Sequence, residues 1–425
     1  MGGPTDHDYS SNCDISSAPM IKLTVYAYAV LIGTNCLAYY SKDVPYFSYA
    51  ALTMLIVCLF NLAFTKQAQN MFKSLQSIDV MLWCVLLCLP LLYLVLSDEI
   101  FERGVWMSYI ISLVMFGLMF IFTVNSNFRS IIAYAALTIV IISSGMNIYE
   151  LLFENNLWST APGRSAGWYE NPNISAGAIT AYGIIYFSHR KISHKRLDFA
   201  ILSLTGAGVL STFSRMGFFL LPCDVLAMSL SYFESNNVKT AAIKTAGIYI
   251  TMLTLFLLGA NVISEKMDLS QDALIRLMSF EQQSVRDVYV ENRGGMALAA
   301  WDLFLQHPLT GLGVRTSLQP SVIPHNMFVG VAVDYGIFGL LVYLGAILRW
   351  LWLGIKKLTV DSKMAWLMLI AWVWIVIFSF ASHNIIYDAT DLLVVAIVLA
   401  MSSASSRLPN ASKSTATRAW PSSYP

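Results

Sequence analysis

The chain has 425 residues, of which 57% are hydrophobic and only 12% are charged, and its formal net charge is +1. A soluble globular protein normally carries about twice that charged fraction, so the composition argues against a large cytosolic protein and indicates an integral membrane protein. A net charge so close to zero gives no reason to expect a nucleic-acid partner.

The first twenty residues are polar and acidic, without the basic start, apolar middle and small-residue cleavage site of a signal peptide. We therefore expect residues 1–20 to form a cytoplasmic tail that stays in the mature chain. The cysteines do not indicate a disulfide framework, because five of the six lie inside apolar runs. These five are Cys36, Cys58, Cys84, Cys88 and Cys223.

Apolar windows long enough to cross about 30 Å of hydrocarbon predict about twelve transmembrane helices, and hence an all-α polytopic membrane protein. The predicted spans are 21–39, 46–65, 78–97, 105–124, 131–152, 174–188, 197–214, 216–233, 245–263, 326–348, 364–382 and 387–402. Nine spans fall within residues 21–263 and three within 326–402. The region 197–233 is ambiguous, since only Ser214 and Arg215 separate two spans and one of them could be broken or re-entrant.

Basic residues indicate the orientation of the chain. Most Lys and Arg side chains lie in the tails and the even-numbered loops, including "HRKISHKR" at 189–196 and "IKK" at 355–357. The positive-inside rule then places both termini in the cytoplasm. Residues 403–425 have the polar composition of a disordered cytoplasmic tail.

The longest predicted outer loop, 264–325, lies between spans nine and ten. Within it "GGMALAAWDLFLQHP" at 294–308 predicts an amphipathic helix that Pro308 ends. We expect Ala297, Trp301, Phe304 and Leu305 to share one face of this helix. A loop of this length with helical content is usually functional.

Cations are concentrated on the predicted outer side, against the positive-inside rule. They are Arg164, Arg215, Arg276, Arg286, Arg293, Arg315, His307, His325 and His383. Solubility of the loops is the simpler interpretation for Arg286 and Arg315. Arg215 is different, because apolar sequence flanks it in "GVLSTFSRMGFFLL" and an ionisable group there usually serves a site. The planar fork and permanent charge of arginine suit a diphosphate.

His325 follows Pro324 and precedes the tenth predicted span, so we expect it in the first turn of a helix. The positive end of the helix dipole favours a neutral ring near pH 7, which can accept a proton. The alternative is that His325 only anchors the helix at the membrane interface. His307, beside Pro308, is expected to be a structural helix stop.

Two acidic positions bear on this histidine. Asp334 is nine residues further, on the opposite helical face and roughly 13 Å along the axis, so we expect it to hydrogen-bond a neighbouring span instead of orienting His325. Asp388, close to His383 in "ASHNIIYDATD", is better placed to orient the base or to bind sugar hydroxyls. The outer loops hold no HExxH motif, DxD pair or carboxylate cluster, so we expect no metal and no cofactor.

In this order, "ENRGGMALAAWDLFLQHPLTGLGV", "PHN" and "VAVDYGIFGLLVYLG" resemble the shared core of the O-antigen ligase and O-antigen polymerase superfamily. "GRSAGWYENPNISAGAI" and "STFSRMGFF" are also similar, so the resemblance covers about 160–345. The family pattern falls on Arg164, Asn173, Ser214, Arg215, Arg293, His307, Pro308, Gly311, Gly313, His325, Asn326, Asp334, Gly336 and Gly339. Asp334 stands where glutamate is commoner in the family.

The resemblance implies a glycosyltransferase of the C type in the bacterial inner membrane, with a periplasmic, metal-independent and inverting active site. It implies an undecaprenyl-diphosphate-linked glycan as donor, with the lipid A-core oligosaccharide as acceptor for a ligase. His325 would be the base, and Arg215 and Arg293 would hold the diphosphate. Further substrate-binding positions would be Arg276, Arg164, Asn173, Asn326 and Asp388.

Three functions remain open from the sequence. A ligase transfers the whole glycan to the lipid A core, and a polymerase transfers it to the next lipid-linked repeat unit. Both use the same donor and chemistry, and the ligase is favoured. A transporter or flippase is the third possibility, but it usually shows internal repeats and a central intramembrane charge site, which we do not find in the sequence.

Overall fold

The computed structural model describes seventeen stretches or single positions of the chain. They are residues 19–41, 53, 56, 77–96, 103–124, 126–154, 157–161, 163–190, 195–232, 247, 251, 254, 287–314, 316–318, 323–359, 362–382 and 385–405. Of the predicted spans, 46–65 and 245–263 lie almost wholly outside these residues. Residues 264–286 of the predicted outer loop 264–325 and nearly all of both tails lie outside them as well.

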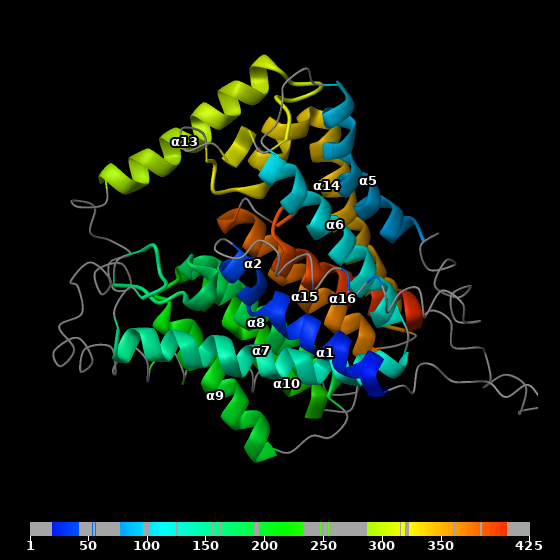
Figure 1. Ribbon diagram of the computed structural model, residues 1–425, viewed down its shortest axis with the longest axis vertical. Coiled ribbons are helices and arrows are strands. Elements are labelled where there is room, and N and C mark those ends of the chain that lie inside the picture. Colours follow the sequence, from blue (N-terminus) through cyan, green and yellow to red (C-terminus); the bar gives the residue numbers. More distant parts are fainter. Residues whose placement is uncertain are drawn as a thin grey trace, which may run out of the picture.

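All regular secondary structure in the described part of the chain is helical (Figure 1). The helices are α1 Pro19–Gly33, α2 Cys36–Ser41, α5 Ile78–Leu96, α6 Arg103–Val124, α7 Ser126–Leu152, α8 Pro172–His189, α9 Lys195–Ser211, α10 Arg215–Tyr232, α13 Asp287–Gln306, α14 Met327–Lys357, α15 Ser362–Ala381 and α16 Ala389–Ser405. Two short 3-10 helices are η2 Gly167–Tyr169 and η3 Thr316–Leu318. Each predicted span that falls on described residues is mostly helical, although 21–39 is interrupted between α1 and α2, and 197–214 ends in non-helical residues after α9.

Several helices have the length and composition of membrane spans, and the chain is a membrane protein. Phe128–Leu152, Met327–Lys357 and Met364–Ala381 are long and apolar enough to cross a bilayer. Shorter apolar helices cover Ile21–Gly33, Ile78–Leu91, Ser112–Val124 and Ala389–Ser403. The total of twelve spans stays a prediction.

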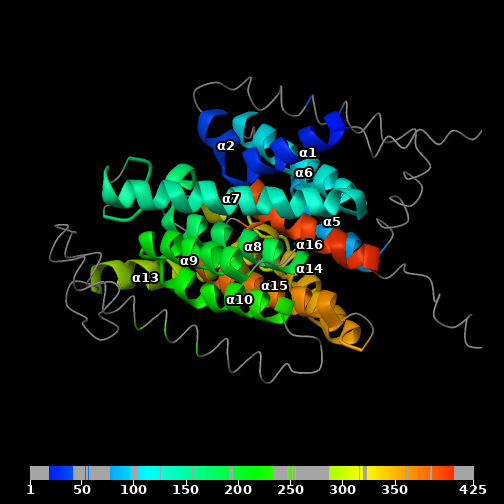
Figure 2. The same ribbon diagram turned by 90° about the horizontal axis from the view of Figure 1, so that it is seen from below.

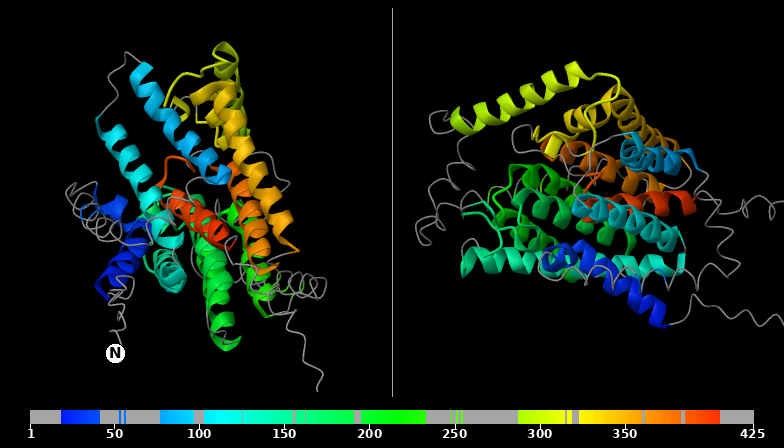
Figure 3. Two further views of the ribbon diagram at one scale, coloured as in Figure 1. Left: turned by 90° about the vertical axis from the view of Figure 1, so that its right-hand side faces the viewer. Right: turned by 45° about the horizontal axis from the view of Figure 1, so that its top comes forward.

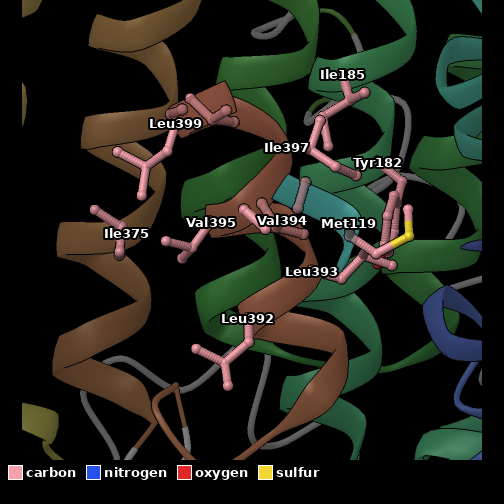
Figure 4. Close-up of a cluster of buried hydrophobic side chains, with 14 of the residues drawn as sticks. Met119, Tyr182, Ile185, Ile375, Leu392, Leu393, Val394, Val395, Ile397 and Leu399 are labelled. Atoms are coloured by element: carbon pink, nitrogen blue, oxygen red, sulfur yellow. The ribbon is translucent and has the colours of Figure 1, made fainter. Parts of the chain in front are cut away.

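Two helices occupy the centre of the bundle. The aliphatic side chains of α16 are buried between α6 and α1 on one side and α8 and α15 on the other (Figures 2 and 4). The other central helix, α8, is buried along almost its whole length and is rich in small residues. A Cβ added at Gly177 would lie 2.3 Å from the Phe378 ring of α15. Small side chains on α8 therefore allow its neighbours to pack closely.

The predicted span 326–348 is helical, but it is not one straight helix, because α14 is broken at Gly336. Gly336 has φ 66° and ψ −163°, a region that essentially only glycine adopts. The rings of Phe328 and Tyr343 are 5.6 Å apart, although a straight helix would separate these positions by roughly 22 Å along its axis. A short segment, 327–335, therefore folds back against the longer segment 337–357 (Figure 3).

Candidate active site

The predicted site residues of the described part lie at one end of the bundle. Phe328, in the first turn of α14, packs its ring 5.1 Å from that of Phe380 in the last turn of α15. Two residues earlier in α15, Phe378 packs against Gly177 of α8. The last turns of α15 thus connect the beginning of α14 with the beginning of α8, where Asn173 lies (Figure 1).

One buried carboxylate organises the loop between α7 and α8. Glu150, in the last turns of α7, is 1% exposed and accepts four backbone N–H groups. Its Oε1 accepts from Trp158 at 2.8 Å and Ser159 at 2.7 Å. Its Oε2 accepts from Ala166 at 2.8 Å and Gly167 at 3.0 Å. These bonds satisfy the buried charge and draw both ends of the loop to the same point.

The same loop is anchored to α1 through Tyr169 of η2. Its buried hydroxyl donates to the Gly33 carbonyl and lies 3.2 Å from the Ser143 hydroxyl. Burial raises the pKa of Tyr169. The phenol therefore stays neutral and remains a hydrogen-bond donor at physiological pH.

The structure brings Arg164 and Asn173 together, as the resemblance implies for residues of one site. The Arg164 guanidinium donates from Nε to the Thr212 carbonyl at 3.0 Å and from Nη2 to Oδ1 of Asn173 at 3.1 Å. The Ser214 hydroxyl donates to the same Oδ1 at 2.8 Å. These contacts form an arginine corner, defined as Arg164, Asn173, Ser214 and the adjacent Arg215.

Arg215 begins α10, and its side chain is exposed. The ambiguous region 197–233 forms two packed helices, α9 and α10, joined by residues 212–214. A cation at the N-terminus of a helix lies at the positive end of the dipole, which is unfavourable for helix stability. The position of Arg215 therefore fits a binding role better than a stabilising one.

A second loop closes over the break in α14. Three backbone bonds join them: Leu312 N to Val333 O at 2.8 Å, Gly313 N to Asp334 O at 3.0 Å, and Ile337 N to Pro308 O at 2.7 Å. Gly311 has φ 71°, and a Cβ there would lie 2.6 Å from the Asp334 carbonyl. Gly311 of the predicted Gly-x-Gly turn is thus required by backbone packing, and Gly313 also has a positive φ, of 103°.

Asp334 links three segments of this region. Its Oδ1 accepts from Ser317 N at 2.8 Å, and its Oδ2 accepts from the Ser317 hydroxyl at 2.9 Å and from the Tyr387 hydroxyl. Tyr387 also lies 2.8 Å, hydroxyl to hydroxyl, from Tyr335. Asp334 was expected to bond a neighbouring span, and it instead bonds η3 and the turn between α15 and α16.

The predicted place of His325 in the first helical turn is wrong. The helix begins at Met327, its N-cap is Asn326, and His325 lies one residue earlier with φ 46°. This left-handed conformation is uncommon for residues other than glycine. The Asn326 side chain accepts from Phe328 N at 2.9 Å and Val329 N at 3.3 Å, so its oxygen caps the helix. Its role in binding substrate stays a prediction.

Asp388 has a similar capping role at α16. Its Oδ1 accepts from Thr390 N at 2.8 Å, and its backbone carbonyl accepts from Leu392 N at 3.0 Å. The side chain is partly exposed. Its expected role in orienting the base or binding sugar hydroxyls stays a prediction. His383, its expected companion, lies outside the described residues.

The predicted amphipathic helix is present as α13 and extends further toward the N-terminus than expected. The rings of Trp301 and Phe304 lie 4.9 Å apart, as expected for residues on one face of this helix. Phe304 is buried together with Ala300, and both pack on α14, whereas Trp301 and Leu305 are exposed. Arg293 belongs to the first half of α13. Arg276, Arg286 and Arg315 lie outside the described residues.

Glu150, Ser317 and Tyr387 organise the two loops but were not predicted. The signal available for Glu150 was an acid at the outer end of an apolar span, which needs a buried partner. Nothing in the local sequence distinguishes Ser317 or Tyr387, because their importance comes from a contact with the distant Asp334.

Comparison with protein families gives one match, and no curated protein matches the chain. The family described as O-antigen ligase matches residues 200–344, which run from α9 through α10 and α13 into the longer segment of α14. The match includes Ser214, Arg215, Arg293, His325 and Asp334. Over this stretch the chain is therefore similar to the O-antigen ligase family, as its motifs predicted.

Proposed function

We propose that the chain is an O-antigen ligase of the bacterial inner membrane. It transfers a glycan from undecaprenyl diphosphate to the lipid A-core oligosaccharide on the periplasmic face. The observation that carries this proposal is the arginine corner, in which Asn173 and Thr212 hold the Arg164 fork beside Arg215. The family match to residues 200–344 supports it independently.

The arginine corner suits the diphosphate of such a donor. Guanidinium groups give charge-assisted and bidentate hydrogen bonds to phosphate oxygens. They also stabilise the negative charge that develops as the diphosphate leaves, so the transfer proceeds without a metal. Arg293 on α13, and Arg276 before it, complete the set of cations in this proposal.

His325 acts as the general base in the proposed reaction. A ring nitrogen takes the proton from an acceptor hydroxyl, whose oxygen bonds to the anomeric carbon of the donor sugar. The bond from that carbon to the diphosphate oxygen breaks on the opposite side, so the anomeric configuration inverts. Asp388, at the neighbouring turn, orients the base or binds a sugar hydroxyl.

Deleting the gene and resolving the lipopolysaccharide of the host by size tests the function. We expect loss of all polymer from the core and accumulation of lipid-linked long chains. A core that carries a single repeat unit would instead identify a polymerase. Unchanged lipopolysaccharide would reject both activities.

Complementation of the deletion tests the site. Arg215→Ala should fail to restore polymer attachment, whereas Arg196→Ala should restore it. Arg196 is a matched control because it is also an exposed arginine near the start of a helix, α9, at the opposite end of the bundle. Equal activity of the two variants at equal expression would remove Arg215 from the site.

A further inference from the structure

An exposed apolar stripe runs along α13, away from the bundle core. Its members are Leu298, Trp301, Leu305 and, just beyond the helix, Leu309, whose exposed fractions are 67%, 42%, 56% and 74%. At 100° per residue the three helical positions lie within about 60° of one another. The face of α13 that packs on α14 is a different one, formed by Ala300 and Phe304.

Polar positions border this stripe on one side. Asp302 and Gln306 are exposed and follow Leu298 around the helix by about 40° and 80°. Asp302 and Gln306 therefore form a polar edge beside the apolar stripe. An exposed apolar stripe with a polar edge fits a helix that lies in a membrane interface, where aromatic residues such as Trp301 are enriched.

The stripe is continuous with the outer surface of α14. The backbone of Leu309 packs against Gly336, and Ile337 N bonds the neighbouring Pro308 carbonyl. Beyond the break, Phe338 and Leu341 are exposed at helical spacing. Since α14 belongs to the membrane-spanning part of the protein, its exposed apolar side chains face lipid.

The length of α14 places α13 at the membrane boundary. Segment 337–357 is about 30 Å long, which alone matches the hydrocarbon thickness. Near its far end Trp352 lies between two cations, with Arg349 at 4.2 Å and Lys356 at 4.9 Å from its ring centre. Such a cluster is typical of one interface, so the break at Gly336 lies near the other.

We propose that α13 is an interfacial helix whose stripe of Leu298, Trp301, Leu305 and Leu309 is embedded in the lipid of the outer leaflet. Asp302 and Gln306 then face the headgroups and water. Figures 1 and 3 show α13 along the outside of the bundle, in contact with the start of α14. Lipid contact then fixes the depth of α13 in the outer interface of the membrane. It thereby also fixes the level of Arg293, which belongs to the same helix. This placement of α13 does not depend on whether the protein transfers a glycan.

Spin labels at positions 305 and 306 give a matched test in the full chain, reconstituted in nanodiscs of phosphatidylethanolamine and phosphatidylglycerol, with the native cysteines replaced. We expect the ratio of collision with oxygen to collision with a nickel chelate to be several-fold higher at 305 than at 306. Equal, water-like ratios would overturn the proposal. Protection of 305 from both reagents would also overturn it, because protein then covers the stripe.

Photocrosslinking provides a second measurement that needs no cysteine replacement. Benzoylphenylalanine at 305 should crosslink to lipid, and at 306 it should not. Crosslinks between two copies of the chain would show that the stripe is a dimer interface and contradict the proposal. Crosslinking of 305 that requires added undecaprenyl phosphate would contradict it as well, since the stripe would then hold a prenyl chain.

Discussion

Two loops at the same end of the bundle are each organised by one buried carboxylate, but in different ways. Glu150 accepts four backbone N–H groups and so fixes the loop that carries Arg164. Asp334 accepts one backbone N–H group and two hydroxyls near the loop that leads to His325. The second loop is also joined to the broken α14 by its own backbone.

The two loops of the site are therefore held in place by different kinds of interaction. The loop between α7 and α8, called the arginine loop because it carries Arg164, depends on a charge, since backbone N–H groups can only donate and need an acceptor. The loop between α13 and α14, called the histidine loop because it leads to His325, depends on backbone conformation. Gly311 in this loop and Gly336 in α14 both have positive φ where their backbones touch. Changes of charge should therefore disturb the first loop most, and changes of backbone freedom should disturb the second.

The largest effect is expected on activity, from His325→Asn. Asparagine tolerates the left-handed backbone at this position, so the loop should keep its shape. Loss of the base should lower the transfer rate by about 10²- to 10⁴-fold. The measurement is glycan transfer by purified protein, with thermal unfolding to check that stability is unchanged.

Asn326→Ser is the control for that variant. Serine also caps helices, so helix α14 should begin normally and activity should be retained if Asn326 only caps. A normal rate for His325→Asn would rule out the histidine as base. A large rate loss in a stable Asn326→Ser variant would show that Asn326 binds substrate.

Gly336→Ala should cause the largest loss of stability. A Cβ at this position would lie 2.3 Å from the Leu309 carbonyl oxygen, and the φ of 66° with ψ of −163° would itself be strained. We expect at least about 3 kcal/mol of destabilisation, measured by thermal unfolding in detergent. Gly345→Ala in the same helix meets no atom within 4 Å and should be tolerated. Similar behaviour of both variants would mean that the break is not rigid.

Glu150→Gln should destabilise the arginine loop by roughly 2–3 kcal/mol. The glutamine amide would point N–H donors at two backbone N–H donors, so two bonds are replaced by repulsion. Glu154→Gln is a suitable control, since Glu154 is exposed and its carboxylate accepts from the Tyr149 hydroxyl at 3.3 Å. Activity should fall with the stability of Glu150→Gln, because Arg164 loses its position. An equal melting temperature for the two variants would contradict the role given to Glu150.

Sequence patterns predicted the helices well and the site only in part. Apolar length located α7, α14 and α15, because crossing hydrocarbon demands it. The resemblance to the family's motifs pointed to Arg164 and Asn173, whose side chains are hydrogen-bonded to each other. Periodicity could not reveal the break at Gly336 or the left-handed His325, since both depend on a loop that folds over α14. It also could not find Tyr387, whose hydroxyl bonds Asp334, 53 residues away in the sequence.

The smallest effect is expected from Asp334→Asn. An asparagine can keep its Oδ1 toward Ser317 N, while its amide nitrogen replaces Oδ2. The hydroxyls of Ser317 and Tyr387 can then rotate and accept from that nitrogen, because a hydroxyl both donates and accepts. We expect about 1 kcal/mol or less of destabilisation and near-normal activity.

Tyr387→Phe should cost a similar amount, about 1 kcal/mol, because it removes one hydrogen bond from the carboxylate. Asp334→Leu should cost more than either variant, since the buried Ser317 N–H would lose its acceptor. Thermal unfolding of these three variants and of Glu150→Gln, under the same conditions, compares how much each change lowers the stability of the protein. If Asp334→Asn were as damaging as Glu150→Gln, the charge of Asp334 would be essential, and both loops would rely on electrostatics.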